Sequence, residues 1–242
     1  MLEVADVRKQ FGGLVAVDGV DFDIGDEEIV GLIGPNGAGK TTLFNTITGV
    51  LDPEPGSRIA FDGQDLVPLA QHEIARLGVV RTFQIVRVFE EMSVLENAAA
   101  GALFGDEEQV SRVEANERGR EALAFIGLAD KADVEASALP IAQKKQLELA
   151  RALASDPKLV LLDEIASGLT PGEISMLTET IERIREERGV SVFWIEHIMD
   201  AIMGVADRVI VLNSGRKIAE GPPAAIRDDE RVIEAYLGEE ET

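Results

Sequence analysis

The chain has 242 residues, 45% of them hydrophobic and none of them cysteine, which is enough apolar material for one large domain. Lys and Arg number 23 against 45 Asp and Glu, and the resulting net charge of −22 disfavours binding to nucleic acid or anionic lipid through the overall field. The absence of cysteine excludes disulfides and thiolate zinc sites. No apolar run approaches the roughly 18 residues that cross a bilayer, and the charged first eight residues do not resemble a signal peptide. We therefore expect a protein of the cell interior without a nucleic-acid partner.

The acidic residues are scattered along the whole chain, which indicates a hydrated acidic surface. Such a surface is typical of a halophilic protein in a salt-rich cytoplasm, because a Debye length of about 3 Å at 1 M salt suppresses repulsion between like charges. The alternative is an ordinary acidic protein.

Alternating apolar and polar residues predict short strands in the first thirty positions. Val20, Phe22 and Ile24 alternate with aspartates, and two further apolar patches, at residues 2–7 and 15–17, are separated by two glycines. Residues 28–33 are a candidate buried strand that leads into a glycine-rich turn. Residues 40–48 are predicted to form the following helix, and residues 58–61 another strand.

From residue 85 to residue 155 the sequence is rich in Ala and Glu and lacks β-branched runs, which predicts a mostly helical insertion. Ser93 and Glu96 have the spacing of a capping box at the start of one helix.

A strand pattern returns at residues 159–162 and again at 190–195. Between them, Thr170 and Glu173 predict a capping box, followed by a helix that Gly189 ends. This alternation of strands and helices predicts an α/β fold with a mixed, mostly parallel sheet whose faces are covered.

The strongest chemical signal is the segment Gly34–Thr41, which matches the pattern G-x-x-x-x-G-K-[ST] at every fixed position. Small residues let backbone N–H groups curl around phosphate oxygens, and the following helix adds its N-terminal dipole. Lys40 would neutralise the β- and γ-phosphates, and the Thr41 hydroxyl would bind Mg²⁺. A predicted strand before the segment and a predicted helix after it favour this P-loop interpretation over a chance glycine-rich turn.

A second signal is the pair of acids that ends the apolar run at residues 159–162. Asp163 and Glu164 would lie at the carboxyl edge of the sheet, where a metal-bound phosphate site is expected. Asp163 would hold Mg²⁺, through water, and Glu164 would polarise the attacking water as general base. The alternative is two exposed acids after a core strand.

Taken in order, the motifs resemble those of the nucleotide-binding subunit of an ATP-binding-cassette (ABC) transporter, over essentially the whole chain. Residues 81–84 (Arg-Thr-Phe-Gln) are similar to the family's glutamine loop, and residues 139–143 (Leu-Pro-Ile-Ala-Gln) stand at the place of its LSGGQ signature. Residues 166–170 stand at the place of the D-loop, and residues 194–197 (Trp-Ile-Glu-His) match the switch-histidine strand.

This resemblance implies a fold and a division of the chain. The fold is α/β: a RecA-like P-loop core with a mixed, mostly parallel sheet, an N-terminal antiparallel β-subdomain and an inserted α-helical subdomain. We expect a single ABC ATPase domain over residues 1–242, with the nucleotide-binding core at 1–84 and 156–242. The helical subdomain, at 85–155, would face a membrane partner.

The resemblance also implies roles for individual residues. His197 would bind the γ-phosphate and orient water and Glu164, and Gln84 would contact Mg²⁺ or that water and relay the nucleotide state. Phe11 would stack on adenine. The alternatives are that Gln84 and His197 are ordinary polar residues at strand ends and that Phe11 belongs to the core. The residues expected to contact nucleotide are Phe11, Gly34, Pro35, Asn36, Gly37, Ala38, Gly39, Lys40, Thr41, Thr42, Ala142 and Gln143.

The signature departs from the family pattern. Pro140 replaces the serine and removes a donor N–H, and Ile141 and Ala142 replace both glycines. Ala142 still offers its N–H to a γ-phosphate held by the other subunit, although its β-carbon crowds the approach. Lys144 and Lys145 follow, and we expect them to add compensating positive charge near the nucleotide. The departure favours a heterodimer, with one strong and one weak site, over a homodimer.

Within the family, the motifs look most like those of ATPases of branched-chain amino-acid importers. The similarity rests on residues 11–17 (Phe-Gly-Gly-Leu-Val-Ala-Val), on the glutamine-loop region, and on residues 195–197 and 236–238 (Ile-Glu-His and Tyr-Leu-Gly). Urea or amide importers and a lipopolysaccharide-export ATPase share parts of these patterns, so they remain alternatives.

The resemblance implies a set of partners and a location. The partners are ATP, Mg²⁺, a second ABC ATPase subunit, integral membrane permease subunits and an extracytoplasmic solute-binding protein, at the inner face of the cell membrane. An ABC ATPase acting on DNA or ribosomes is the less favoured alternative, since those proteins need basic surfaces or tandem cassettes. A small-metabolite kinase would leave Gln84, His197 and residues 139–143 unexplained.

Overall fold

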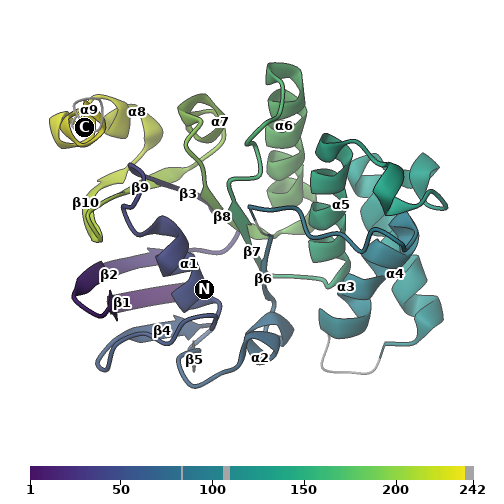
Figure 1. Cartoon of the computed structure of the whole chain (residues 1–242), viewed down its shortest axis with the longest axis horizontal. Coiled ribbons are helices and arrows are strands. Elements are labelled where there is room, and N and C mark those ends of the chain that lie inside the picture. The colour runs from purple at the N-terminus through teal and green to yellow at the C-terminus, as the bar shows by residue number, and fades with distance from the viewer. Residues whose placement is uncertain (83, 106–109, 238–242) are drawn as a thin grey trace.

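The computed structural model describes residues 1–82, 84–105 and 110–237 (Figure 1). Phe83 of the glutamine-loop motif and Gly238 of the closing motif lie outside the described residues. Two sheets, one helical region and helices around the larger sheet make up the described part of the chain. Within that part, no helix combines the length and the apolar character that crossing a membrane requires.

The amino-terminal residues form an antiparallel sheet with strand order β2-β1-β4-β5. Its strands are β1 (Leu2–Phe11), β2 (Leu14–Ile24), β4 (Arg58–Phe61) and β5 (Gln64–Asp65). The two apolar patches at 15–17 and 20–24, expected as separate short strands, belong to the one long strand β2. Its pairing with β1 shifts register three times, so the apolar side chains stay on the core face although the spacing is irregular.

The second sheet has strand order β10-β9-β3-β8-β7-β6 and is parallel except for the β9–β10 hairpin. Its strands are β3 (Ile29–Ile33), β6 (Val79–Arg81), β7 (Leu159–Asp163), β8 (Ser191–Ile195), β9 (Arg208–Asn213) and β10 (Arg216–Gly221). The expectation of a mixed, mostly parallel sheet is confirmed. Because the parallel strands point the same way, the loops after β3, β6, β7 and β8 meet at one edge of the sheet.

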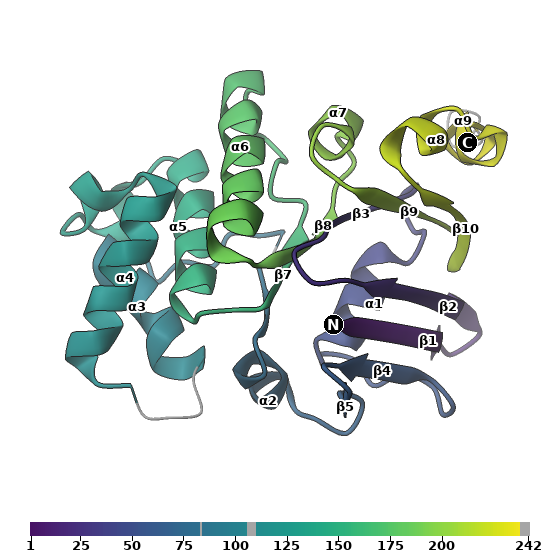
Figure 2. The same cartoon turned by 180° about the vertical axis from the view of Figure 1, so that it is seen from behind.

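Helix α1 (Lys40–Ile47) lies between the two sheets in both views of Figures 1 and 2. Its Phe44 ring lies 4.8 Å from that of Phe193 on β8, and Phe193 also contacts Phe22 on β2 at 5.2 Å. One apolar core therefore joins α1 to both sheets and fixes where the helix begins. The remaining helices around this core are α2 (Gln71–Arg76), α6 (Pro171–Arg188), α7 (Met199–Met203), α8 (Pro223–Arg227) and α9 (Glu230–Leu237).

The predicted capping boxes are present. The Thr170 hydroxyl accepts the Glu173 N–H and the Glu173 carboxylate accepts the Thr170 N–H, and Gly189 ends α6 at φ 65°. Ser93 and Glu96 make the same reciprocal pair at the start of the first helix of the insertion.

The helical region consists of α3 (Val94–Gly105), α4 (Arg112–Ile126) and α5 (Ile141–Ala154), with short 3-10 turns at Ala129–Lys131 and Ala136–Ala138. Close backbone contact holds the helices together: a Cβ at Gly101 would lie 1.9 Å from the Arg151 carbonyl oxygen, so only glycine fits there. These helices stand at one end of the molecule in Figure 1. The division of the chain at 85 and 155 stays a prediction.

Candidate functional site

The P-loop joins the end of β3 to the start of α1, and its glycines are required by its shape. Gly34, Gly37 and Gly39 have φ angles of 148°, 74° and 99°, all in the region that side chains disfavour. A Cβ at Gly39 would lie 2.2 Å from the Ala16 carbonyl oxygen, and one at Gly34 would lie 2.1 Å from that of Leu212. The loop is therefore packed against β2 and β9.

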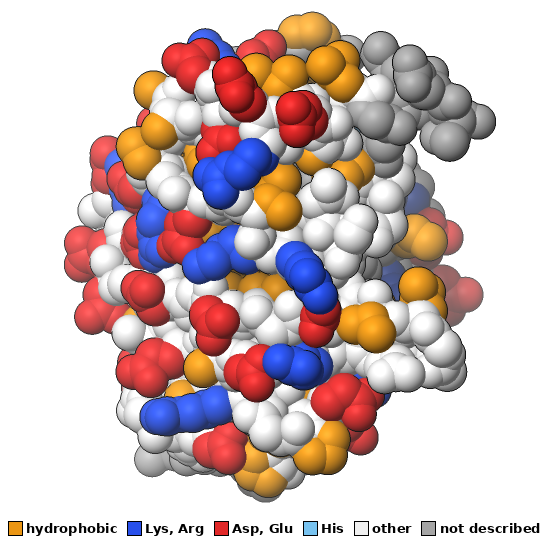
Figure 3. Space-filling model, turned by 90° about the vertical axis from the view of Figure 1, so that its left-hand side faces the viewer, with side chains coloured by type: hydrophobic (Ala, Val, Ile, Leu, Met, Phe, Trp, Pro, Cys, Tyr) orange, Lys and Arg blue, Asp and Glu red, His pale blue; other side chains and the backbone are white. Residues whose placement is uncertain are grey.

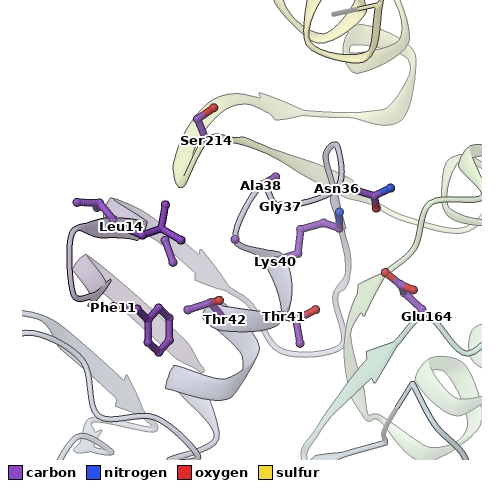
Figure 4. A pocket seen from close by; sticks show the side chains of 13 residues that line it. Phe11, Leu14, Asn36, Gly37, Ala38, Lys40, Thr41, Thr42, Glu164 and Ser214 are labelled. Carbon is purple, nitrogen blue, oxygen red and sulfur yellow. The ribbon is translucent and has the colours of Figure 1, made fainter. Parts of the chain in front are cut away.

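Lys40 is buried at the first position of α1, beneath the loop. Its ammonium donates hydrogen bonds to the carbonyl oxygens of Gly34, at 2.6 Å, and Pro35, at 2.9 Å. This local positive charge lies inside the curve of the loop, where Figure 4 shows the Lys40 side chain. An anion entering the loop would thus meet a cation despite the net charge of −22.

A cavity of about 490 Å³ opens between the P-loop and the hairpin formed by β1 and β2 (Figure 4). Phe11, 45% exposed, closes one side of it, and Glu164 faces the loop from the opposite side. The predicted residues that line the cavity are Phe11, Asn36, Gly37, Ala38, Gly39, Lys40, Thr41, Thr42 and Glu164. Residue pattern alone did not single out Leu14, Val15, Ala16 and Ser214, which line it too.

Asp163 ends β7 and is 1% exposed. Its Oδ2 accepts a hydrogen bond of 2.6 Å from Arg81 at the end of β6, and a second Arg81 nitrogen donates to Asn45 Oδ1 on α1. The Oδ1 atom of Asp163 has no hydrogen-bond partner among the described residues. Arg81 thus links the P-loop helix, the glutamine-loop strand and the acidic strand, a role that sequence analysis missed.

The three residues expected to handle the attacking water lie together. Gln84 Nε2 donates a 2.6 Å hydrogen bond to Glu164 Oε2, and His197 Nδ1 lies 3.9 Å from the same oxygen. Glu164 has a φ of 48°, which is strained for a residue with a side chain. The edge of the larger sheet therefore brings the loops after β6, β7 and β8 to one point.

Glu196 is a second carboxylic acid at this point and was not singled out as a site residue. Its side chain is fully buried, and its Oε1 accepts a 2.6 Å hydrogen bond from the Ala166 N–H. Burial raises the pKa of Glu196, partly offset by the hydrogen bond from Ala166. Its Oε2 lies 3.9 Å from His197 Nδ1.

The altered signature lies at the start of α5, and none of its residues lines the cavity beside the P-loop. Ala142 and Gln143 line a separate cavity of about 150 Å³ between α5 and α6. Lys144 and Lys145 were expected to add compensating positive charge near the nucleotide, and in the described structure both ammonium groups contact other groups of this chain. Lys144 pairs with Glu90 at 2.9 Å, and Lys145 donates to the carbonyl oxygens of Ile165 and Ser167.

An α/β sheet with a glycine-rich turn before α1 and acids at the end of β7 defines a P-loop nucleotide-binding protein. The sequence profile of ABC transporters matches residues 17–167, and the profile of branched-chain amino acid ATP-binding cassette transporters matches residues 216–242. The chain therefore belongs to the ABC transporter family, as one of its ATP-binding cassettes, and is an ABC ATPase.

Two relatives are each 41% identical over 99% of this chain and 98% of their own length. They are the high-affinity branched-chain amino acid transport ATP-binding proteins BraF of Pseudomonas aeruginosa and LivG of Escherichia coli. A solved ATP-binding cassette of an ABC transporter in its ADP conformation is 31% identical, with a TM-score of 0.89 over 98% of both chains. A further match, cbiO1 of Clostridium perfringens, part of the transporter complex cbiONQ, is 27% identical with a TM-score of 0.84 over 96% of this chain and 92% of its own.

Proposed function

We propose that the chain binds ATP with Mg²⁺ and hydrolyses it to power the import of branched-chain amino acids. The observation that carries the proposal is the cavity of about 490 Å³ that brings the P-loop, Phe11 and Glu164 together. Amides of residues 36–41 surround the phosphates, while Phe11 stacks on the adenine. Lys40 exchanges its bonds to the Gly34 and Pro35 carbonyls for bonds to phosphate oxygens.

The residues near the cavity fit Mg²⁺. The Thr41 hydroxyl, the Gln84 side-chain oxygen and the Asp163 carboxylate are oxygen donors, which this ion prefers. The unpartnered, buried Oδ1 of Asp163 needs a polar partner such as a metal-bound water. Bound Mg²⁺ would neutralise charge on the β- and γ-phosphates.

Hydrolysis depends on the cluster at the sheet edge. Glu164 accepts the proton of the attacking water, because its carboxylate is the group facing the P-loop across the cavity. Gln84 holds that carboxylate through its 2.6 Å hydrogen bond, and His197 contacts the γ-phosphate. Lys40 stabilises the charge on the transferring phosphoryl group.

The proposed assembly pairs the cassette with a second ABC ATPase subunit, permease subunits and a solute-binding protein, at the inner face of the cell membrane. Closure of the two cassettes would bring Ala142 and Gln143 to the partner's nucleotide, which is supported by their separation from this chain's own cavity. Contacts to the γ-phosphate made only in the closed state would shift the population toward closure. The altered signature favours a heterodimer.

The assignment of the solute rests on similarity, because the names of BraF and LivG describe branched-chain amino acid transport. The second candidate, a urea or amide importer or a lipid exporter, shares parts of the same motifs.

Nucleotide binding is tested by isothermal titration of ATP with and without Mg²⁺. Wild type should bind, and Lys40→Ala should bind at least tenfold more weakly, since one charge-assisted contact to phosphate contributes about 1.5–3 kcal/mol. The exposed Lys158, which pairs with Asp62 in the turn between β4 and β5, provides the control Lys158→Ala. Equal affinity in Lys40→Ala and wild type would overturn the assignment of the P-loop.

Transport is tested in vesicles that hold the chain together with its co-purified membrane subunits and binding protein. Labelled leucine should accumulate in an ATP-dependent way, and Glu164→Gln should abolish accumulation while ATP binding persists. Uptake of urea with no uptake of leucine would favour the second candidate. Unchanged turnover in Glu164→Gln would refute the assignment of the base.

We also propose that the protein works in a salt-rich cytoplasm. Figure 3 shows acidic side chains spread over the viewed face, among basic and hydrophobic ones. Repulsion among the acidic side chains should weaken the fold in dilute buffer, so the free energy of unfolding should rise with KCl up to about 1 M. Full stability in dilute buffer, measured by urea unfolding, would contradict this proposal.

A further inference from the structure

The turn after β7, residues 164–169, is held from two sides by a half-buried ammonium group and a buried carboxyl group that the proposed chemistry does not use. From α5, the Lys145 ammonium donates to the carbonyl oxygen of Ile165, at 2.9 Å, and to that of Ser167. From the loop after β8, Glu196 Oε1 accepts the N–H of Ala166 at 2.6 Å. Lys145 and Glu196 thus bind three consecutive residues of the turn, directly after Glu164.

Glu164 requires such support because its backbone is strained. A φ of 48° is unfavourable for a residue with a side chain, and it persists only where neighbouring contacts enforce it. On its amino-terminal side, the Glu164 N–H is fixed by the Ile195 carbonyl oxygen at 2.9 Å. On its carboxyl-terminal side, the contacts of Lys145 and Glu196 fix the next three residues.

We propose that Lys145 and Glu196 are positioning residues, which hold the strained backbone of Glu164 so that its carboxylate faces the P-loop cavity. The inference rests on the proposed role of Glu164 as base. We name the pair the turn clamp. Because Lys145 lies on the signature helix and Glu196 precedes His197, the clamp also makes the position of the base depend on both of these elements.

The side chain of Glu196 is fully buried and that of Lys145 is half-buried. Burial lowers the pKa of Lys145 and raises that of Glu196. Such desolvation is unfavourable, so each group should be retained for what it holds. The two contacts differ in what they need: Ala166 needs only an acceptor, whereas the carbonyls of Ile165 and Ser167 need a donor.

This difference gives a set of variants. Glu196→Gln keeps a side-chain oxygen for the Ala166 N–H, whereas Glu196→Ala removes it. Lys145→Met keeps the apolar stem and removes the donor. Lys144→Met is the matched control on the neighbouring residue, whose partner Glu90 lies outside the turn. Glu28→Ala is the control for loss of a carboxylate that accepts a backbone N–H, from Gly25 at 2.8 Å, ahead of β3.

The first measurement is steady-state ATPase activity of the assembled transporter. Glu196→Ala and Lys145→Met should lower kcat about tenfold to a hundredfold, with KM for ATP within about threefold of wild type, because a small displacement of the base affects chemistry and not binding. Glu196→Gln should stay within about threefold of wild type in kcat, and both controls should keep their kcat. Equal losses in the controls, or unchanged kcat in Glu196→Ala, would overturn the proposal.

The second measurement is hydrogen exchange at the Ala166 amide, which needs neither nucleotide nor turnover. Exchange should be at least about tenfold faster in Glu196→Ala and close to wild type in Glu196→Gln and Glu28→Ala. Unchanged protection in Glu196→Ala would overturn the clamp alone. Failure of wild type to bind or hydrolyse ATP would instead overturn the proposed function, and the base-positioning role with it.

Discussion

The buried ion pair between Arg81 and Asp163 allows a quantitative test of the site's architecture. The two side chains are 6% and 2% exposed, and their nearest polar atoms lie 2.6 Å apart. In Arg81→Gln, Asp163 would keep its burial and lose its cationic partner, while its other oxygen already has no partner in the described part of the chain. Removing one member of a buried pair costs about 3–5 kcal/mol, because the remaining charge is uncompensated.

The double variant separates this penalty from the value of the pair itself. In Arg81→Gln with Asp163→Asn, no charge is left behind, so we expect most of the lost stability to return. Urea unfolding followed by the fluorescence of Trp194, the one tryptophan of the chain, measures all four proteins of the cycle. A loss below about 1 kcal/mol in Arg81→Gln, or a double variant as unstable as the sum of the single ones, would refute the reasoning.

Three further predictions concern other parts of the chain. Thr170→Ala removes the hydroxyl that caps α6 and should lower the free energy of unfolding by about 1 kcal/mol, whereas Thr178→Ala inside α6 should cost less; equal losses would contradict the capping role. Gly39→Ala places a Cβ 2.2 Å from the Ala16 carbonyl oxygen and should weaken ATP binding in a titration at least about tenfold, with Gly172→Ala, whose Cβ meets no atom within 4 Å, as control. Burial raises the pKa of Glu196 above its ordinary 4.5, so the folded state binds more protons than the unfolded state between 4.5 and the raised pKa, and stability falls as pH rises through that interval. Glu196→Gln removes this fall, so its stability relative to wild type should grow from about pH 4 upward and then level off; a constant difference up to about pH 8 would argue against a raised pKa.

The local parts of the site follow from the sequence. The P-loop pattern has fixed spacing, and the strand before it and the helix after it are short-range signals. The capping pairs at Ser93 and Thr170 likewise depend on residues three apart. These features need no knowledge of the tertiary fold, and the structure contains each of them.

The missed parts depend on contacts between distant residues. Arg81 and Asp163 are 82 positions apart, and nothing near either residue in the sequence shows that the strands that end with them are neighbours in the sheet. The buried contact of Glu196 with Ala166 spans 30 positions. Lys145 was expected to add positive charge near the nucleotide, and its hydrogen bonds to the carbonyl oxygens of Ile165 and Ser167, 20 and 22 positions away, were not foreseen.

Strands β9 and β10 were also not predicted, but unlike the contacts above they have a local signal in the sequence. An apolar run at residues 209–212 (Val-Ile-Val-Leu) is followed by Asn-Ser-Gly at 213–215 and then by Ile218 and Ala219, a combination typical of a hairpin turn. Reading this signal would have placed Ser214 near the end of a strand, although its position at the nucleotide cavity still depends on β9 pairing with β3.

The β9–β10 hairpin also determines when, during synthesis, the P-loop can take its phosphate-binding shape. The Gly215 N–H donates to the Ala38 carbonyl oxygen at 3.0 Å, and the Gly215 carbonyl oxygen accepts the Asp18 N–H at 2.8 Å. The P-loop is thus supported by residues made more than a hundred positions later. During synthesis, the P-loop motif leaves the ribosome long before Gly215, which supports it. Affinity for ATP should therefore appear only after β9 and β10 have left the ribosome.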